Sequence, residues 1–110
     1  METIYELEER SYQFAKKCRH YIKNLPETVS NFEDSRQLIK TSGALGIKII
    51  FIKESGSIDL SNIKKALRKT EKIKYWLRLL NNLNPEFTDH FDSLLYDIEA
   101  LKKHLQRLQQ

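Results

Sequence analysis

The residues of this 110-residue chain that are best suited to chemistry are basic side chains concentrated between residues 60 and 80. That segment contains seven Lys and Arg residues and a single acid, Glu71, which gives it a net charge of +6. The whole chain carries +4, so the remaining residues together carry −2. Lysine and arginine at this local density attract phosphate groups.

Five of these cations fall within a sector of about 140° on a helical wheel, opposite an apolar face. The five residues, called the basic face below, are Lys64, Lys65, Arg68, Lys69 and Lys72. Like charges four residues apart repel by a few tenths of a kcal/mol, so the basic face does not stabilise its own helix. The pattern therefore predicts a surface that binds the phosphates of RNA or DNA.

An ordinary solvated helix surface is the alternative explanation of the same stripe. In that case the cations would pair with acids of a neighbouring helix, such as Asp89 or Asp92. No aromatic residues interleave with the stripe as they do in proteins that stack the bases of single strands.

The sequence shows no pattern typical of a catalytic or metal site. No Glu stands three residues before His20, His90 or His104, as the Glu-x-x-His pairs of di-iron bundles require. His-Glu-x-x-His motifs, phosphate-binding Gly-rich loops and zinc-binding Cys pairs are also missing from the sequence. We interpret each histidine as a surface or boundary residue, and we expect no enzymatic activity, no cofactor, no metal and no small-molecule substrate.

The single cysteine, Cys18, cannot form an intramolecular disulfide and lies on the apolar side of its expected helix. We expect a buried, inert thiol, with a reactive thiol as the alternative. The acidic N-terminal residues do not resemble a signal peptide. The longest apolar run, from Ile49 to Ile52, is far shorter than the roughly 20 residues that span a bilayer. These features predict a cytoplasmic protein that does not enter a membrane.

Apolar residues recur at spacings of three and four along most of the chain, which is the period of an α-helix. The first helix should end before Pro26, and the second should begin at the capping box formed by Ser30–Glu33. The second helix should break at Ser55–Ser57, and the third should begin at Ser57 or Asp59.

Asn84 followed by Pro85 is typical of a helix start, with Asn as the cap and Pro in the first turn, so a fourth helix is expected from there to Leu108. The four expected core faces are Leu7, Ser11, Phe14, Cys18, Tyr21 and Leu25; Leu38, Ser42, Leu45, Ile49 and Ile52; Leu60, Ile63, Leu67, Thr70, Ile73 (or Lys74), Leu77 and Leu80; and Phe87, Phe91, Leu94, Ile98, Leu101, Leu105 and Leu108.

The composition agrees with helices, since the chain has fifteen Leu but one Val, and only three Gly and two Pro. Four amphipathic helices of about 20 to 27 residues with short connections predict one all-α domain, an antiparallel up-down four-helix bundle spanning residues 1–110.

The second helix is expected to be apolar on two sides. The segment 47–52 has strong strand propensity, but the core face of its helix continues through it, so we expect it to be helical. A second set of apolar residues falls mostly on the other side of this helix: Ile39, Ile47, Ile50 and Phe51. Because a bundle has one interior, we expect these residues to pack against another copy of the chain. The alternative is that neighbouring helices cover them more fully than ideal geometry suggests.

Several segments occur in an order that resembles a known family. They are Tyr5–Arg10, Phe14–Lys16, Leu25–Pro26, Gln37–Gly46 and Tyr75–Leu80. In this order the chain resembles the bacterial four-helix bundle proteins encoded within intervening sequences of 23S rRNA genes. The similarity covers nearly the whole chain, and Tyr75–Leu80 is its most specific part.

The resemblance implies a homo-oligomeric ring, typically a homopentamer, without enzymatic activity. More distantly, the chain is similar to the accessory variability determinant of diversity-generating retroelements, a basic pentamer that binds nucleic acid and a reverse transcriptase. By resemblance, Trp76 and Leu77 are core or interface residues and Arg78 is a basic position beside them. The chain departs from the family at Lys48 and Phe51, where relatives have Asn and Glu. The leading hypothesis is an oligomeric nucleic-acid-binding protein, and the alternative is a structural or interaction ring with a protein partner such as a reverse transcriptase.

Overall fold

The computed structural model describes residues 3–109, which contain four α-helices, one short 3₁₀ turn and no strand. The elements are α1 (Ile4–Lys23), α2 (Val29–Glu54), α3 (Leu60–Leu83), η1 (Pro85–Phe87) and α4 (Thr88–Leu108). The helices have 20, 26, 24 and 21 residues and form a bundle of 44 × 23 × 18 Å. The predicted all-α four-helix bundle is confirmed.

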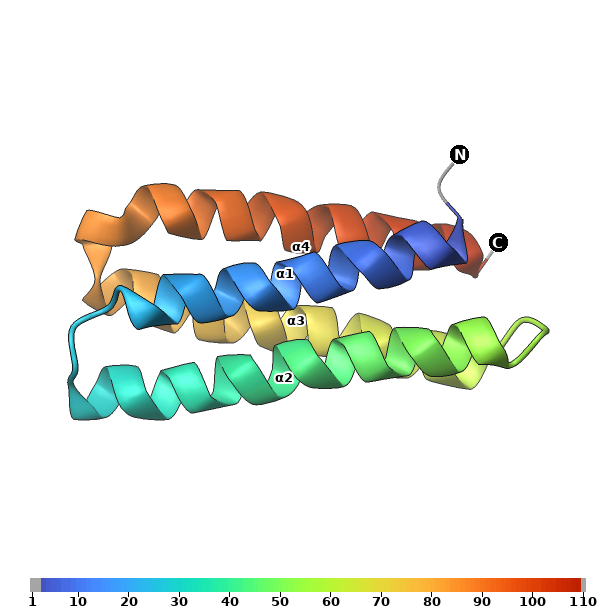
Figure 1. Cartoon of the computed structure of the whole chain (residues 1–110), viewed down its shortest axis with the longest axis horizontal. Coiled ribbons are helices and arrows are strands. Elements are labelled where there is room, and N and C mark those ends of the chain that lie inside the picture. Colours follow the sequence, from blue (N-terminus) through green and yellow to red (C-terminus); the bar gives the residue numbers. More distant parts are fainter. Residues whose placement is uncertain (1–2, 110) are drawn as a thin grey trace.

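The four helices lie along the long axis, and consecutive helices run in opposite directions (Figure 1). Ion pairs between neighbouring helices have the register that this arrangement requires. Glu8 in the first half of α1 meets Lys53 near the end of α2, with oxygen and nitrogen 2.6 Å apart. Lys74 of α3 meets Glu99 of α4 at 2.5 Å.

The start of α2 differs from the capping box expected at Ser30. The helix begins at Val29, and the hydroxyl of Thr28 accepts a hydrogen bond from the backbone N–H of Asn31 at 3.1 Å. Thr28 and Ser30 are both suitable caps, and the chain uses the earlier one, so the prediction was wrong by two residues. At the start of α3, Asp59 is the cap, as one of the two sequence alternatives predicted.

The turn between α2 and α3 depends on a glycine. Gly56 follows the C-cap Ser55 and has a φ of 70°, in the left-handed region that favours glycine after a helix C-terminus. This turn places the end of α2 beside the start of α3.

Asn84 does not cap the fourth helix, contrary to the sequence prediction. Its side chain is 2% exposed and faces Asn31 at the start of α2. Each amide donates to the other, at 2.8 and 3.0 Å, and the remaining N–H groups reach the carbonyls of Leu80 and Pro26. The chain makes a 3₁₀ turn after Asn84, and α4 begins at Thr88.

The core agrees closely with the predicted periodicity. Every residue of the first two expected faces is buried, and the segment 47–52 is helical. In the third face, Leu67 is half-buried, and Leu60 is 48% exposed because it is the first residue of α3 and lies at the end of the bundle. In the fourth face, Phe87, Phe91 and Leu108 are half-buried rather than buried.

Candidate nucleic-acid interface

The basic face lies on the first half of α3 and points away from the core. Lys64, Lys65, Arg68 and Lys72 are exposed and Lys69 is half-buried. The opposite side of the same turns is buried in the bundle and consists of Ile63, Ala66, Thr70 and Ile73. The helix therefore places these five cations side by side on the surface of the bundle.

The five cations of the basic face form no ion pair within residues 3–109. No carboxylate there lies within ion-pair distance of its five cations, and neither Asp89 nor Asp92 pairs with it. The next lysine, Lys74, behaves differently, because it is bound to Glu99 at 2.5 Å and lies 3.7 Å from Glu71. Glu71 and Glu99 are thus bound to lysines outside the basic face.

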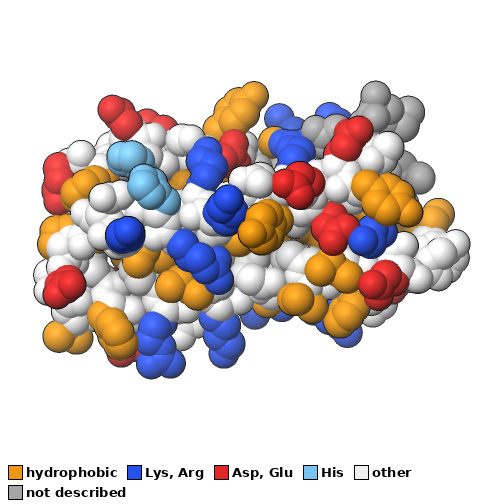
Figure 2. Space-filling model, in the orientation of Figure 1, with side chains coloured by type: hydrophobic (Ala, Val, Ile, Leu, Met, Phe, Trp, Pro, Cys, Tyr) orange, Lys and Arg blue, Asp and Glu red, His pale blue; other side chains and the backbone are white. Residues whose placement is uncertain are grey.

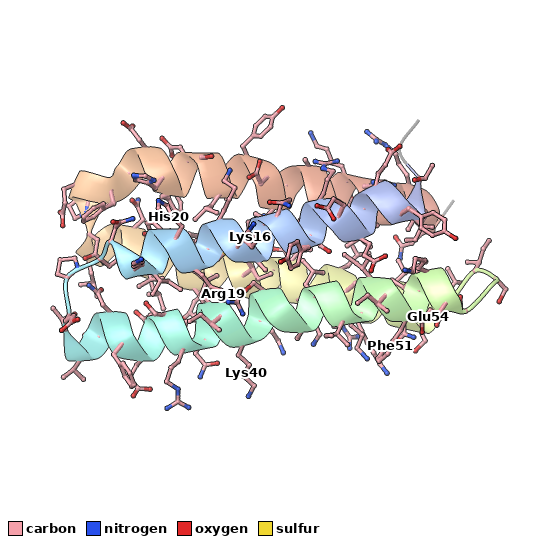
Figure 3. The ribbon with its side chains drawn as sticks, in the orientation of Figure 1. Lys16, Arg19, His20, Lys40, Phe51 and Glu54 are labelled. Carbon is pink, nitrogen blue, oxygen red and sulfur yellow. The ribbon has the colours of Figure 1, made fainter. Side chains whose placement is uncertain are left out.

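Cations of α2 extend the basic face across the helix boundary. The pKa of Lys69 is lowered, first by partial burial and then by the positive charges of Lys72, Lys48 and Lys65. Lys48 belongs to α2, so the repulsion crosses from one helix to the next. Lys40 lies two turns before Lys48, on the edge of α2 that is turned away from α1 (Figure 3).

Two acids border the basic face, and each is held by another group. The Asp59 carboxylate accepts hydrogen bonds from the backbone and side-chain N–H groups of Asn62 at 3.1 and 2.7 Å, and these bonds lower its pKa. Glu71 lies 2.7 Å from the ammonium of Lys102 in α4, which lowers the pKa of its carboxyl.

Aromatic side chains lie beside the end of the basic face, although none interleaves with its five residues. A groove of about 490 Å³ between α2 and α3 is lined by Lys69 and Lys72 together with Tyr75 and Trp76. Lys40 is one of the residues that line its α2 side. Tyr75 and Trp76 follow Lys72 by three and four residues on α3 itself, whereas Lys40 belongs to α2. Helix packing therefore adds the α2 side of the groove, and the aromatic rings come from the same helix as the basic face.

The sequence contained a partial signal for the contribution of α2. Lys40, Ala44 and Lys48 are spaced by four residues, which places two cations on one helical face with a small residue between them. Whether that face meets the basic face depends on how α2 packs against α3, and the pattern alone does not specify it.

Three of the four residues of the expected interface are exposed on the surface of α2. Ile39, Ile47 and Phe51 are 36%, 50% and 45% exposed, and Ile50 is half-buried. Phe51 shares the α2 edge of Lys40 in Figure 3, and the ammonium of Lys48 lies 5.6 Å from the centre of its ring. Helices of the same chain leave these side chains accessible.

Ile47 and Ile50 line a different groove, of about 780 Å³, between α1 and α2. Figure 2 shows hydrophobic side chains along this boundary, with charges of both signs around them. The floor contains Gly43 and Gly46, where an added Cβ would meet only Arg19 at 3.9 Å and Ser11 at 3.8 Å, respectively. Tyr5 and Tyr12 of α1 also line this apolar groove, and their side chains are 69% and 58% exposed.

The cysteine and the three histidines do not lie together in one site. Cys18 is buried as predicted, and burial raises the pKa of its thiol to about 12, so little thiolate exists at neutral pH. His20 and His90 are exposed as expected, but His104 is buried in α4, so its interpretation as a surface or boundary residue was wrong. Among residues 3–109, no three His, Cys, Asp or Glu side chains are placed to hold a metal ion.

None of the helices in the described part of the chain combines the length and apolar character needed to cross a membrane. Comparison of the chain with protein-family models, with curated proteins and with solved structures finds no match.

Proposed function

We propose that this chain is a non-enzymatic, oligomeric protein of the cytoplasm that binds RNA or DNA through the basic face of α3. The observation that carries the proposal is the set of five adjacent cations without an acidic partner within residues 3–109. Four other lysines, in contrast, are each bound to a carboxylate: Lys17, Lys53, Lys74 and Lys102.

The cations of the basic face repel one another. The lowered pKa of Lys69 shows that its protonated form is disfavoured by burial and by neighbouring cations. A polyanion placed on this surface relieves that repulsion and releases its own counterions, which is the main source of affinity in protein–nucleic acid contacts. A stripe whose members repel one another is better explained by an external anion than by a contribution to folding.

Assembly would strengthen this binding. The accessible Ile39 and Ile47, together with the apolar groove between α1 and α2, support packing against a second copy of the chain. Repeated basic faces on one ring raise avidity without any new contact. The resemblance to the four-helix bundle proteins of 23S rRNA intervening sequences supports the same ring, and we include membership of that family in the proposal.

Charge reversal on the basic face tests the proposal. The double variant Lys64→Glu/Arg68→Glu should bind oligonucleotides at least about tenfold more weakly at low salt, because it loses two phosphate contacts and adds two repulsive charges. Gel shifts or fluorescence anisotropy with labelled RNA and DNA measure the effect.

Lys103→Glu/Arg107→Glu is the matched control, because it changes the same residue types at the same spacing on an exposed side of α4. This control should bind nearly as the wild type does. Equal weakening by both variants would show a general effect of net charge and contradict a defined site. If a pull-down that survives nuclease treatment yields one stoichiometric protein, and oligonucleotides do not bind, the interaction-ring alternative is correct.

Assembly has a separate test at Ile47. The wild-type chain should have a native mass that is a multiple of 13.1 kDa, and Ile47→Asp should reduce it to that of a single chain because a carboxylate would be buried at the interface. Ile58→Asp replaces an isoleucine that is 69% exposed in the turn before α3, and it should leave the mass unchanged. Light scattering measures all three. A wild-type monomer at working concentration would contradict the oligomer.

A further inference from the structure

The groove between α2 and α3 combines the two kinds of side chain that bind single-stranded nucleic acid. Lys69 and Lys72 of the basic face form part of its lining, and Lys40 lies on its α2 side. Tyr75 and Trp76 line the same groove. Cations that follow a backbone, next to aromatic rings on which bases stack, are the two components of single-strand binding surfaces.

The two aromatic rings are held in contact and are accessible. Their centroids are 5.1 Å apart, and their planes are inclined at 76° in an edge-to-face arrangement. Trp76 is half-buried and packs against the hydrophobic core, whereas Tyr75 is 53% exposed. The core thus anchors Trp76, which in turn restrains Tyr75 at the surface, so little ring mobility would be lost when a base binds.

Tyr75 also lies between two depressions. On one side is the groove with Lys69 and Lys72, and on the other side is a second groove that contains Arg78. A strand that crosses Tyr75 would therefore meet cations before and after the ring.

Glu71 is the acid that lines this groove, and lysines of α3 and α4 neutralise its negative charge. Its carboxylate lies 2.7 Å from Lys102 and 3.7 Å from Lys74, and the pKa of its carboxyl is lowered mainly by Lys102. A phosphate in the groove would therefore face an acid already bound by cations of α3 and α4.

We propose that this groove binds single-stranded nucleic acid, with a base stacked on Tyr75 and the flanking phosphates at Lys69, Lys72 and Arg78. The inference rests on the proposed function and specifies its ligand. A duplex cannot use the aromatic ring, because its bases are stacked within the helix. The protein therefore prefers a single strand to a duplex of the same length.

Trp76 provides an internal probe because it is the only tryptophan in the chain. Titration with a single-stranded thymidine or uridine homopolymer should change its fluorescence, and a duplex of equal length should bind more weakly. Tyr75→Ala should reduce single-strand affinity by about tenfold or more, the usual effect of removing one stacking platform. Because no phosphate contact is lost, the salt dependence of binding should be unchanged.

Two variants serve as controls. Tyr75→Phe keeps the ring and should bind nearly as the wild type does, and Tyr96→Ala removes a tyrosine of α4 that is 76% exposed and should have no effect. If Tyr75→Ala binds as tightly as Tyr96→Ala, or if duplex and single strand bind equally, stacking in the groove is wrong. If charge reversal at Lys64 and Arg68 still weakens binding in that case, the proposed function stands. Failure of the wild type to bind either form at low salt would overturn both proposals.

Discussion

Replacement of Ile49 by alanine is expected to lower the free energy of unfolding by about 2 to 5 kcal/mol. Ile49 is 0% exposed and belongs to the core face of α2, so truncation leaves a cavity between helices. A chain of this size has a total stability of about 5 to 15 kcal/mol, and the variant should therefore be marginally folded. Urea unfolding followed by circular dichroism measures the change.

Ile47→Ala is the control because Ile47 is 50% exposed only two residues away. In a strand, residues 47 and 49 would share a face, whereas in a helix they lie about 200° apart. The loss at Ile49 should not depend on protein concentration, and any loss at Ile47 should vanish on dilution because it reflects assembly. Equal losses at all concentrations would contradict a helical segment with one buried side.

The second large effect is expected at the buried amide pair that joins α2 to the corner after α3. Asn84→Ala removes its two hydrogen bonds with Asn31 and the bond to the carbonyl of Leu80. Because the Asn31 amide stays buried without its partner, the free energy of unfolding should fall by about 2 to 3 kcal/mol. Thermal and urea denaturation both report this change.

A double-mutant cycle distinguishes a true pair from two independent residues. The loss in Asn31→Ala/Asn84→Ala should be smaller than the summed single losses by about 0.5 to 3 kcal/mol, because each single variant leaves an unpaired amide. Asn82→Ala, at an exposed position of α3, should change stability little. Strict additivity of the two single variants would show that the amides do not depend on each other.

The helices and their core could be predicted because the relevant information is local. The spacing from Leu38 through Ile49 to Ile52 repeats within a few residues, and the buried side of α2 follows from it directly. The helix starts were less predictable. Thr28 and Ser30 have similar capping chemistry, and local sequence does not determine which one is used.

Features that depend on distant partners could not be read from the sequence. Asn84 turns inward because Asn31, 53 residues earlier, completes its hydrogen bonds. In the candidate interface, periodicity identified the five cations of α3. The positions of Lys40 and Lys48 relative to them depend on the packing of α2 against α3. Tyr75 follows Lys72 on the same helix, so its place beside the basic face was readable from the sequence.

In α3, the residues that stabilise the fold differ from the residues that we propose bind nucleic acid. Core residues of α3 such as Ile73 and Leu77 hold the helix in the bundle, while its outer side carries cations that make no ion pair within residues 3–109. Substitutions on the basic face should therefore alter binding without unfolding the protein, so the two properties can be measured independently.

The most direct test of the central proposal is the salt dependence of nucleic-acid binding by the wild type and by Lys64→Glu/Arg68→Glu. If the five cations of the basic face contact phosphates of a single strand, the logarithm of the binding constant should fall with the logarithm of salt concentration with a slope of about −3.5. This slope corresponds to a loss in affinity of about 100-fold between roughly 50 and 200 mM salt. In the double variant the slope should become shallower by about 1.4 or more, while the control Lys103→Glu/Arg107→Glu keeps the wild-type slope. Binding that is independent of salt, or a slope that the double variant leaves unchanged, would contradict a phosphate-binding face on α3.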